Sequence, residues 1–317
     1  MVGSEGGAAA PAPRRVQGAG LNLAATEYGD ASRPTVLLVH GFPDTSAVWG
    51  PLVRSLSPDF HVVTYDVRGA GQSDTPASRD GYALELLAAD VAAVADTFSP
   101  SRPVHLVAHD WGSIQAWEAV TTVRLTGRFA SYTSISGPPI DHAALWARAH
   151  RTRRWEDIRL ALRQAIHSWY IAFFHLPVLP NLVARIAGNR GVWSRTLHRV
   201  ENVPSDGDWP APTLAADFSH GVELYRANIR ERFRRPRPGH TDTPVQIVVA
   251  KRDRYVMPAL LQGLEAWSPT VWKREVDAGH WVIRTHPTEI ARWVREVIEF
   301  TEDGREVPEL AASRVAG

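Results

Sequence analysis

The segment Val104-His105-Leu106-Val107-Ala108-His109-Asp110-Trp111-Gly112 decides the fold of this chain. It starts with an apolar run, residues 104–108, that is too short for a helix and predicts a buried strand. A helix is expected to begin near Ser113. Between the two, the order small residue, any residue, nucleophile, any residue, glycine is typical of a sharp turn that exposes a reactive side chain. Asp110 occupies the nucleophile position, although an aspartate here is also consistent with a simple helix N-cap.

Other short apolar runs, each bounded by polar residues, glycine or proline, predict further strands. They are residues 35–39, 61–65, 132–136 and 245–250. The alanine and leucine spacing of residues 84–98 is typical of a helix that lies between two of these strands. Alternating strand and helix signals predict an α/β fold with a mostly parallel sheet flanked by helices.

The composition and the hydrophobic pattern of the sequence change in the middle of the chain. Between about residues 139 and 238, arginine, tryptophan and helix-like spacing dominate, and no strand signal appears. We therefore predict a helical cap at 139–238, inserted into a core of residues 20–138 and 239–302, at the sheet edge where ligands bind in such folds. Residues 1–19 are predicted to be a flexible N-terminal tail, and residues 303–317 a C-terminal tail or linker.

Composition argues against several kinds of protein. The 317 residues include 35 basic and 34 acidic side chains, so the net charge of +1 gives no reason to expect nucleic acid or an anionic membrane as the main partner. Because cysteine is absent, there is no disulfide framework, thiol nucleophile or thiolate metal site. No apolar segment is long enough to span a membrane, and the first residues do not resemble a secretory signal, so we expect a cytoplasmic location.

Two more polar residues follow strand signals. Asp253 comes just after the strand at 245–250, and His280 stands in the small-residue loop 277–281. Together with Asp110 they give the chain order nucleophile, acid, histidine, which is the order found in α/β-hydrolases. Each residue alone could be structural, but their occurrence in this order, each near a strand end, favours a catalytic triad.

Further motifs give the chain a family resemblance. His40-Gly41-Phe42-Pro43 follows the strand at 35–39, and Asp66-Val67-Arg68-Gly69-Ala70-Gly71-Gln72-Ser73-Asp74 looks like the turn Arg-Gly-x-Gly-x-Ser-Asp that is common in α/β-hydrolases. Over residues 20–300 the chain resembles the epoxide hydrolase branch of that superfamily. It is most similar to the hydrolase domain of mycobacterial-type proteins in which this domain precedes a short-chain dehydrogenase. If the natural protein is longer, the resemblance implies a C-terminal dehydrogenase domain.

The resemblance implies a role for each site residue. Asp110 would attack an epoxide carbon, and His280, oriented by Asp253, would activate the water that hydrolyses the ester to a diol. Tyr170 and Tyr225 match the two cap tyrosines that hydrogen-bond the epoxide oxygen in this family. The remaining assignments are the backbone N–H groups of Phe42 and Trp111 for the oxyanion hole, and His40, Pro43, Trp169 and Trp281 for substrate binding.

Neither a metal nor an organic cofactor is expected, because this chemistry needs none and the sequence shows no metal-ligand spacing. The apolar, aromatic-rich cap predicts a small-molecule hydrophobic epoxide as the substrate, such as a bulky lipid or aryl epoxide, with water as the second reactant. Two alternatives stay open. A haloalkane or haloacid dehalogenase would use the same aspartate nucleophile, and a ligand-binding domain could keep this fold without turnover.

Overall fold

The structure, a computed structural model, describes residues 11–150 and 154–315. These residues contain a nine-stranded sheet in the order β1-β2-β4-β3-β5-β6-β7-β8-β9. Strands β3 to β8 run parallel, whereas β1, β2 and β9 are antiparallel to their neighbours. The strands are Arg14–Gln17 (β1), Asn22–Tyr28 (β2), Thr35–Val39 (β3), His61–Tyr65 (β4), Val104–His109 (β5), Phe129–Ile135 (β6), Val245–Ala250 (β7), Val271–Val276 (β8) and Arg314–Val315 (β9).

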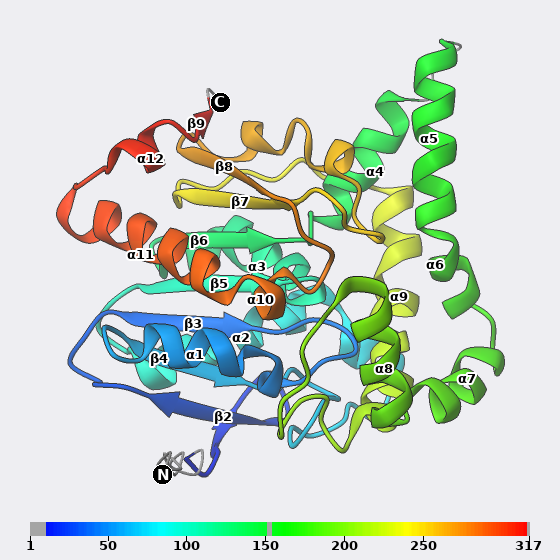
Figure 1. Cartoon of the computed structure of the whole chain (residues 1–317), viewed down its shortest axis with the longest axis horizontal. Coiled ribbons are helices and arrows are strands. Elements are labelled where there is room, and N and C mark those ends of the chain that lie inside the picture. Colours follow the sequence, from blue (N-terminus) through cyan, green and yellow to red (C-terminus); the bar gives the residue numbers. More distant parts are fainter. Residues whose placement is uncertain (1–10, 151–153, 316–317) are drawn as a thin grey trace, which may run out of the picture.

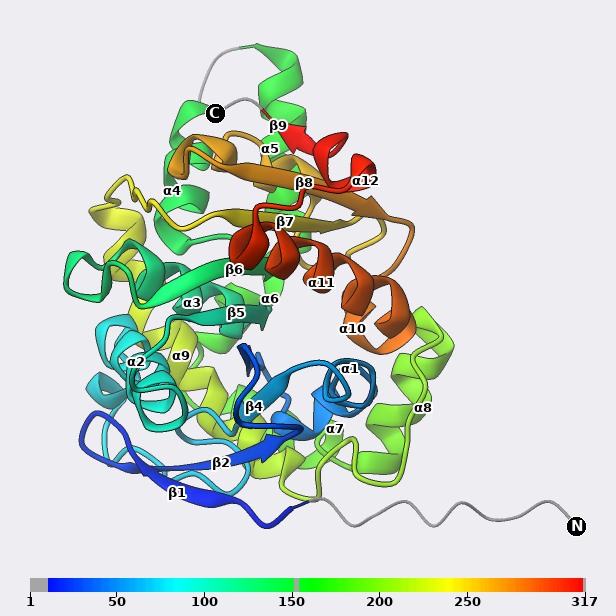
Figure 2. The same ribbon diagram turned by 90° about the vertical axis from the view of Figure 1, so that its left-hand side faces the viewer.

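The central strands are buried on both faces of the sheet, which explains why their sequences read as continuous apolar runs. In β3, Val36 and Leu38 pack into one apolar core, while Leu37 and Val39 pack into a second core on the other face. Five helices form the covering layers, with α1, α10 and α11 on one side and α2 and α3 on the other (Figure 2). Their bounds are Gly50–Leu56 (α1), Leu84–Phe98 (α2), Trp111–Thr121 (α3), Val282–Thr285 (α10) and Pro287–Asp303 (α11).

Between β6 and β7 the chain leaves the sheet. The described residues of this part, 136–150 and 154–244, form helices and contribute no strand to the sheet. These helices stand beyond the carboxyl ends of the parallel strands, and we call residues 140–234 the cap (Figure 1). The cap helices are Ile140–Ala149 (α4), Trp155–His167 (α5), Trp169–Phe174 (α6), Leu179–Ala187 (α7), Arg190–Glu201 (α8) and Leu214–Arg234 (α9).

A buried arginine fastens α9 to the rest of the molecule. The guanidinium of Arg232 lies 2.7 Å from Asp141 of α4 and 2.8 Å from both Glu118 of α3 and Glu85 of α2. Three carboxylates around one buried cation compensate for its desolvation. About one turn earlier on the same helix, the side-chain oxygen of Asn228 accepts a hydrogen bond from the N–H of Leu84. α9 is therefore fixed against the core along the stretch that carries Tyr225.

The Asp66–Asp74 turn is a structural element of the core. Arg68 makes a buried, two-contact ion pair with Asp90 of α2, at 2.6 and 2.8 Å. The carboxylate of Asp66 accepts hydrogen bonds from Ser46 and from the backbone of Gln72. These contacts explain the arginine and the first aspartate of the motif without giving either a chemical role.

The structure corrects several predicted boundaries. Residues 14–17 belong to β1 and Val16 is buried, so the prediction of a flexible tail is wrong there; residues 1–10 lie outside the described residues. The predicted tail 303–317 contains Pro308–Ala311 (α12) and β9, and Leu310 is fully buried. Strand β5 extends one residue further than predicted, to His109, and β6 starts earlier, at Phe129. Short edge elements carry too few apolar residues to be seen in the sequence.

Candidate active site

Asp110 stands at the tight turn between β5 and α3. Its backbone has φ 54° and ψ −125°, a conformation that costs an ordinary residue free energy and persists only where the surrounding structure enforces it. The turn also needs Gly112, because a Cβ atom there would lie 2.1 Å from the carbonyl oxygen of Val39. The strained turn lifts the Asp110 carboxylate out of the sheet and toward the cap.

The structure brings the two other predicted triad residues to this carboxylate. His280, in the loop after β8, has Nε2 at 3.5 Å from Oδ2 of Asp110 and Nδ1 at 2.8 Å from Oδ2 of Asp253. The second oxygen of Asp253, Oδ1, accepts the backbone N–H groups of Tyr255 and Val256. These bonds fix the carboxylate of Asp253, which in turn orients the imidazole of His280.

Electrostatic attraction between His280 and the neighbouring aspartates stabilises the charged forms of His280 and Asp253. Burial lowers the pKa of His280, but the negative charges of Asp253 and Asp110 outweigh it and hold the pKa well above its usual 6.5. Burial raises the pKa of Asp253, but the positive charge of His280 outweighs this effect and keeps it below its usual value. The two shifts favour an imidazolium at His280 paired with the carboxylate of Asp253.

A backbone donor already contacts the carboxylate of Asp110. The N–H of Phe42 lies 2.7 Å from Oδ1 of Asp110, in the turn that follows β3. Gly41 permits this approach, since a Cβ atom there would lie 2.3 Å from the same oxygen. The ring of Phe42 packs against Phe174, Phe218 and Tyr225 of the cap. The N–H of Trp111, the second predicted oxyanion donor, stays a prediction.

The two predicted cap tyrosines lie together beside the nucleophile. Tyr170 comes from α6 and Tyr225 from α9, and their ring centroids are 6.0 Å apart. The ring of Tyr225 also packs edge-on against Trp111, at 4.8 Å. Burial, with nearby Asp110 among the further causes, raises the pKa of both phenols well above the usual 10. Both hydroxyl groups are thus protonated and able to donate at neutral pH.

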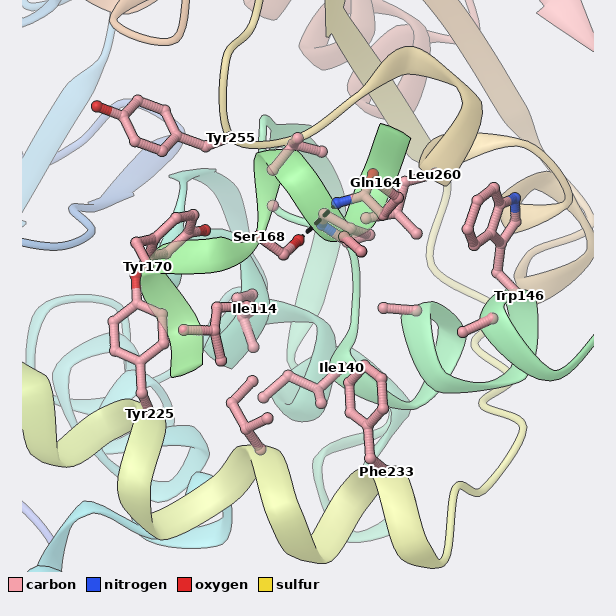
Figure 3. A pocket seen from close by; sticks show the side chains of 18 of the residues that line it. Ile114, Ile140, Trp146, Gln164, Ser168, Tyr170, Tyr225, Phe233, Tyr255 and Leu260 are labelled. Carbon is pink, nitrogen blue, oxygen red and sulfur yellow. Dashed lines mark hydrogen bonds between the residues drawn. The ribbon is translucent and has the colours of Figure 1, made fainter. Parts of the chain in front are cut away.

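An elongated apolar cavity of about 510 Å³ extends from Asp110 into the cap. Tyr170 and Tyr225 lie next to each other at one end, while Trp146 and Phe233 lie at the other end (Figure 3). Side chains of α4, α5, α6 and α9 form most of the wall, and Asp110 and Trp111 form part of the floor. A volume of this size suits a small to medium-sized apolar molecule.

Of the four predicted substrate-binding residues, Trp169 lines the cavity and the other three do not. The geometry gives no support to His40, whose ring is buried with Nδ1 bonded to the carbonyl of Gly41 and Nε2 accepting the N–H of Val67, and its assignment stays a prediction. Pro43 lines a separate small recess, together with His40 and Phe42. Trp281 is buried behind His280, and its indole donates to Asp44. These three residues shape the turns that carry the site.

Three further residues at the site escaped the sequence analysis. Tyr255 lines the cavity and packs edge-on against the rings of His280 and Tyr170, at 4.9 and 5.6 Å. Glu201, the last residue of α8, accepts the N–H of Trp281 beside the histidine. Asp44 accepts the indole N–H groups of Trp209 in the cap and Trp281 in the core. The sequence contains a signal that could have identified Tyr255 and Asp44, because each lies within two residues of a predicted site residue.

No group of three or more histidine or acidic side chains suited to a metal ion occurs among residues 11–150 and 154–315. Within the same residues, no helix has the length and apolar character needed to cross a bilayer.

Comparison with known proteins gives results that agree with this geometry. A family described as having the alpha/beta hydrolase fold matches residues 34–287. A Mycobacterium tuberculosis protein named "Probable oxidoreductase EphD" is 35% identical over 293 residues, covering 90% of this chain and 49% of that protein. The chain therefore spans about half the length of this relative. Mouse epoxide hydrolase 3 is 25% identical over 287 residues, covering 88% of this chain and 74% of the relative.

Solved structures show the same fold. A Bacillus megaterium epoxide hydrolase, solved with an inhibitor, superposes with a TM-score of 0.74 at 23% identity, covering 90% of this chain and all of that one. Epoxide hydrolase VrEH1 of Vigna radiata gives a TM-score of 0.68, also at 23% identity. At this level of identity, the similarity establishes the fold and no more.

Proposed function

The chain belongs to the α/β-hydrolase fold family, and we propose that it hydrolyses epoxides to vicinal diols through an ester on Asp110. The observation that carries the proposal is the position of Tyr170 and Tyr225, two protonated phenols beside a nucleophilic carboxylate at one end of an apolar cavity. An epoxide needs both groups at once, because its carbon must be attacked while its oxygen receives a proton.

In the first step, Oδ2 of Asp110 attacks an epoxide carbon, and the bond from that carbon to the ring oxygen breaks. Oδ1 is held by the N–H of Phe42, so Oδ2, which faces Nε2 of His280 at 3.5 Å, is the oxygen that attacks. Tyr170 and Tyr225 hydrogen-bond the ring oxygen, and one of them transfers its proton to it. The products are a neutral ester on Asp110, an alcohol and a phenolate.

In the second step, His280 removes a proton from water, and the resulting hydroxide attacks Cγ of Asp110. Forming the ester removes one of the two negative charges that raise the pKa of His280, so the imidazolium then passes its proton to the phenolate, which restores the phenol, and the neutral imidazole acts as the general base. The oxyanion that develops on Oδ1 already faces the N–H of Phe42. The bond between Cγ and Oδ2 breaks, Oδ2 leaves with the substrate and takes the proton of the new carboxyl group, and the diol departs. Asp110 is again a carboxylate and His280 again an imidazolium, as at the start.

The same residues argue for an epoxide over a haloalkane. A dehalogenase needs donors that cradle a halide ion, whereas the site offers two phenols whose protons suit an alkoxide. The side chain of Trp111 is itself hydrogen-bonded to Tyr225. The cavity wall is almost entirely apolar, so we propose a small hydrophobic epoxide as the substrate.

The decisive experiment supplies the purified protein with styrene oxide and, separately, with a primary chloroalkane of similar size. We expect diol formation from the epoxide and no chloride release, and we expect Asp110→Asn to form no diol. Chloride release without diol would identify a dehalogenase. A folded protein that turns over neither compound nor a wider panel of epoxides would indicate a binding domain without turnover.

A further inference from the structure

The cap carries an unusual concentration of exposed apolar side chains. Among the described residues, every exposed large apolar side chain except Val123 lies between residues 155 and 233. On α5 and the start of α6 they form a row, which we call the outer stripe. It consists of Trp155, Ile158, Leu162, Ile166 and Trp169. The stripe follows the helical repeat, so that its members share one face of α5 and continue onto α6.

A second row lies on the next part of the cap. Val178, Leu179, Leu182 and Ile186 are exposed on α7 and the loop before it. Both α5 and α7 lie on the side of the cap that faces away from the sheet (Figure 1). The two rows lie on different helices, and exposed apolar rows of this kind on a soluble protein commonly mark a contact with a partner or a membrane.

Basic side chains accompany the apolar ones. Residues 154–201, which span α5 to α8, contain seven arginines and only three acidic residues. Arg159 and Arg163 follow one flank of the outer stripe, and Arg185 stands on α7; all three are exposed. The net charge of the whole chain is only +1, but this part of the cap is strongly basic. Tryptophan at both ends of the stripe is a side chain that favours the boundary between lipid and water.

We infer that the cap docks through the outer stripe and α7 onto the surface of an anionic phospholipid bilayer. A helix with a tryptophan-containing apolar face and a basic flank binds such an interface. The apolar face is buried among the lipids, and the basic side chains pair with lipid phosphates. A second copy of the chain fits less well, because a twofold contact through the stripe would bring the same arginines of both copies together.

Docking through the outer stripe places the bilayer next to the catalytic cavity. Ala161, Gln164 and Ala165, which occupy another face of α5, line the catalytic cavity. Trp169 belongs to both surfaces, since it is 65% exposed and also lines the cavity. A bilayer in contact with the outer stripe therefore adjoins the cavity wall, where an apolar molecule dissolved in lipid needs to enter. The docking itself does not depend on the proposed reaction.

Sedimentation of the full chain with lipid vesicles tests the inference without any measure of catalysis. Vesicles of phosphatidylcholine are compared with vesicles that also contain phosphatidylglycerol, at low and at high salt. We expect binding to the anionic vesicles that falls at high salt. The double change Leu162→Ser/Ile166→Ser should weaken it by roughly tenfold or more. Arg159→Gln/Arg163→Gln should weaken it at low salt, and Val123→Ser, an exposed apolar residue outside the cap, should leave it unchanged.

Thermal unfolding of each variant shows whether it is folded; the changed side chains are exposed, so we expect unaltered melting. The inference is overturned if the wild-type chain binds neither kind of vesicle. It is equally overturned if folded Leu162→Ser/Ile166→Ser protein binds as the wild type does. A wild-type dimer in gel filtration that this double change converts to monomer would assign the surface to a second copy.

Discussion

Nε2 of His280 lies 3.5 Å from Oδ2 of Asp110, while Nδ1 of the same ring is bonded to Asp253 at 2.8 Å. The ring thus stands between the nucleophile and the acid, on the side from which water must reach an ester on Asp110. This arrangement separates the two steps of the proposed reaction, because the first step uses Asp110 and the second uses His280.

Replacing His280 by alanine should trap the ester. Attack by Asp110 on an epoxide needs no base, whereas hydrolysis of the ester does, so the variant should accumulate one covalently bound substrate per chain. Intact-mass and peptide mass spectrometry after incubation with an epoxide that the wild type hydrolyses would locate the adduct on Asp110. If that variant carries no adduct with any such epoxide, the two-step scheme is incorrect.

The two cap phenols should be needed for ring opening. Tyr170→Phe and Tyr225→Phe should each lower kcat by roughly 10²-fold, and the double variant should show no measurable diol formation, since no acid then protonates the ring oxygen. Tyr65→Phe is the matched control: this phenol is buried in the core, and its hydroxyl has no hydrogen-bond partner among the described residues. A double variant with full activity would remove both tyrosines from the mechanism.

The sequence predicts the triad because of how parallel sheets are built. Asp110, Asp253 and His280 each follow a strand, and the carboxyl ends of parallel strands meet at one edge, so residues far apart in the chain come together there. The same argument cannot find Glu201, which reaches His280 from a cap helix whose position depends on tertiary packing.

The substrate-binding assignments that the geometry does not support have a physical cause as well. His40 and Trp281 sit next to the oxyanion turn and the catalytic histidine in the sequence, which makes them look like substrate contacts. Their polar atoms are satisfied by backbone groups of the core and by Asp44. A residue close in sequence to a site residue belongs to the same turn. Its side chain can nevertheless point into the core instead of into the cavity.

The buried carboxyl of Asp44 should make stability depend on pH. Burial, partly offset by hydrogen bonds from Trp209 and Trp281, raises its pKa from 3.8 to about 6. The folded chain therefore binds this proton more tightly than the unfolded chain. Stability should fall by up to about 3 kcal/mol as pH rises from about 4 to about 6, and stay lower above that.

Urea unfolding of the wild type and of Asp44→Asn at a series of pH values isolates this contribution, because the other titrating groups are common to both proteins. The difference in unfolding free energy between them should change across that interval, in favour of the wild type at the acidic end. A difference that is constant from pH 4 to pH 7 would show that Asp44 titrates normally.

Glu201 should hold the catalytic histidine in position from the cap. Its Oε2 lies 3.4 Å from the N–H of Trp281, and it packs so closely on the loop that a Cβ atom at Gly279 would lie 2.4 Å from it. Burial raises its pKa, while the nearby positive charge of His280 opposes that rise. Glu201→Ala removes the acceptor and frees the loop, so kcat should fall about tenfold or more, with little change in KM.

Glu201→Gln is the informative partner of that variant, because its amide oxygen still accepts the N–H of Trp281 but carries no charge. If Glu201 acts by position, the glutamine variant should keep most of the wild-type kcat. Loss of the nearby carboxylate should lower the pKa of His280 and shift the acidic limb of the pH profile to lower pH. Wild-type kcat in the alanine variant would mean that the loop after β8 holds His280 without help from the cap.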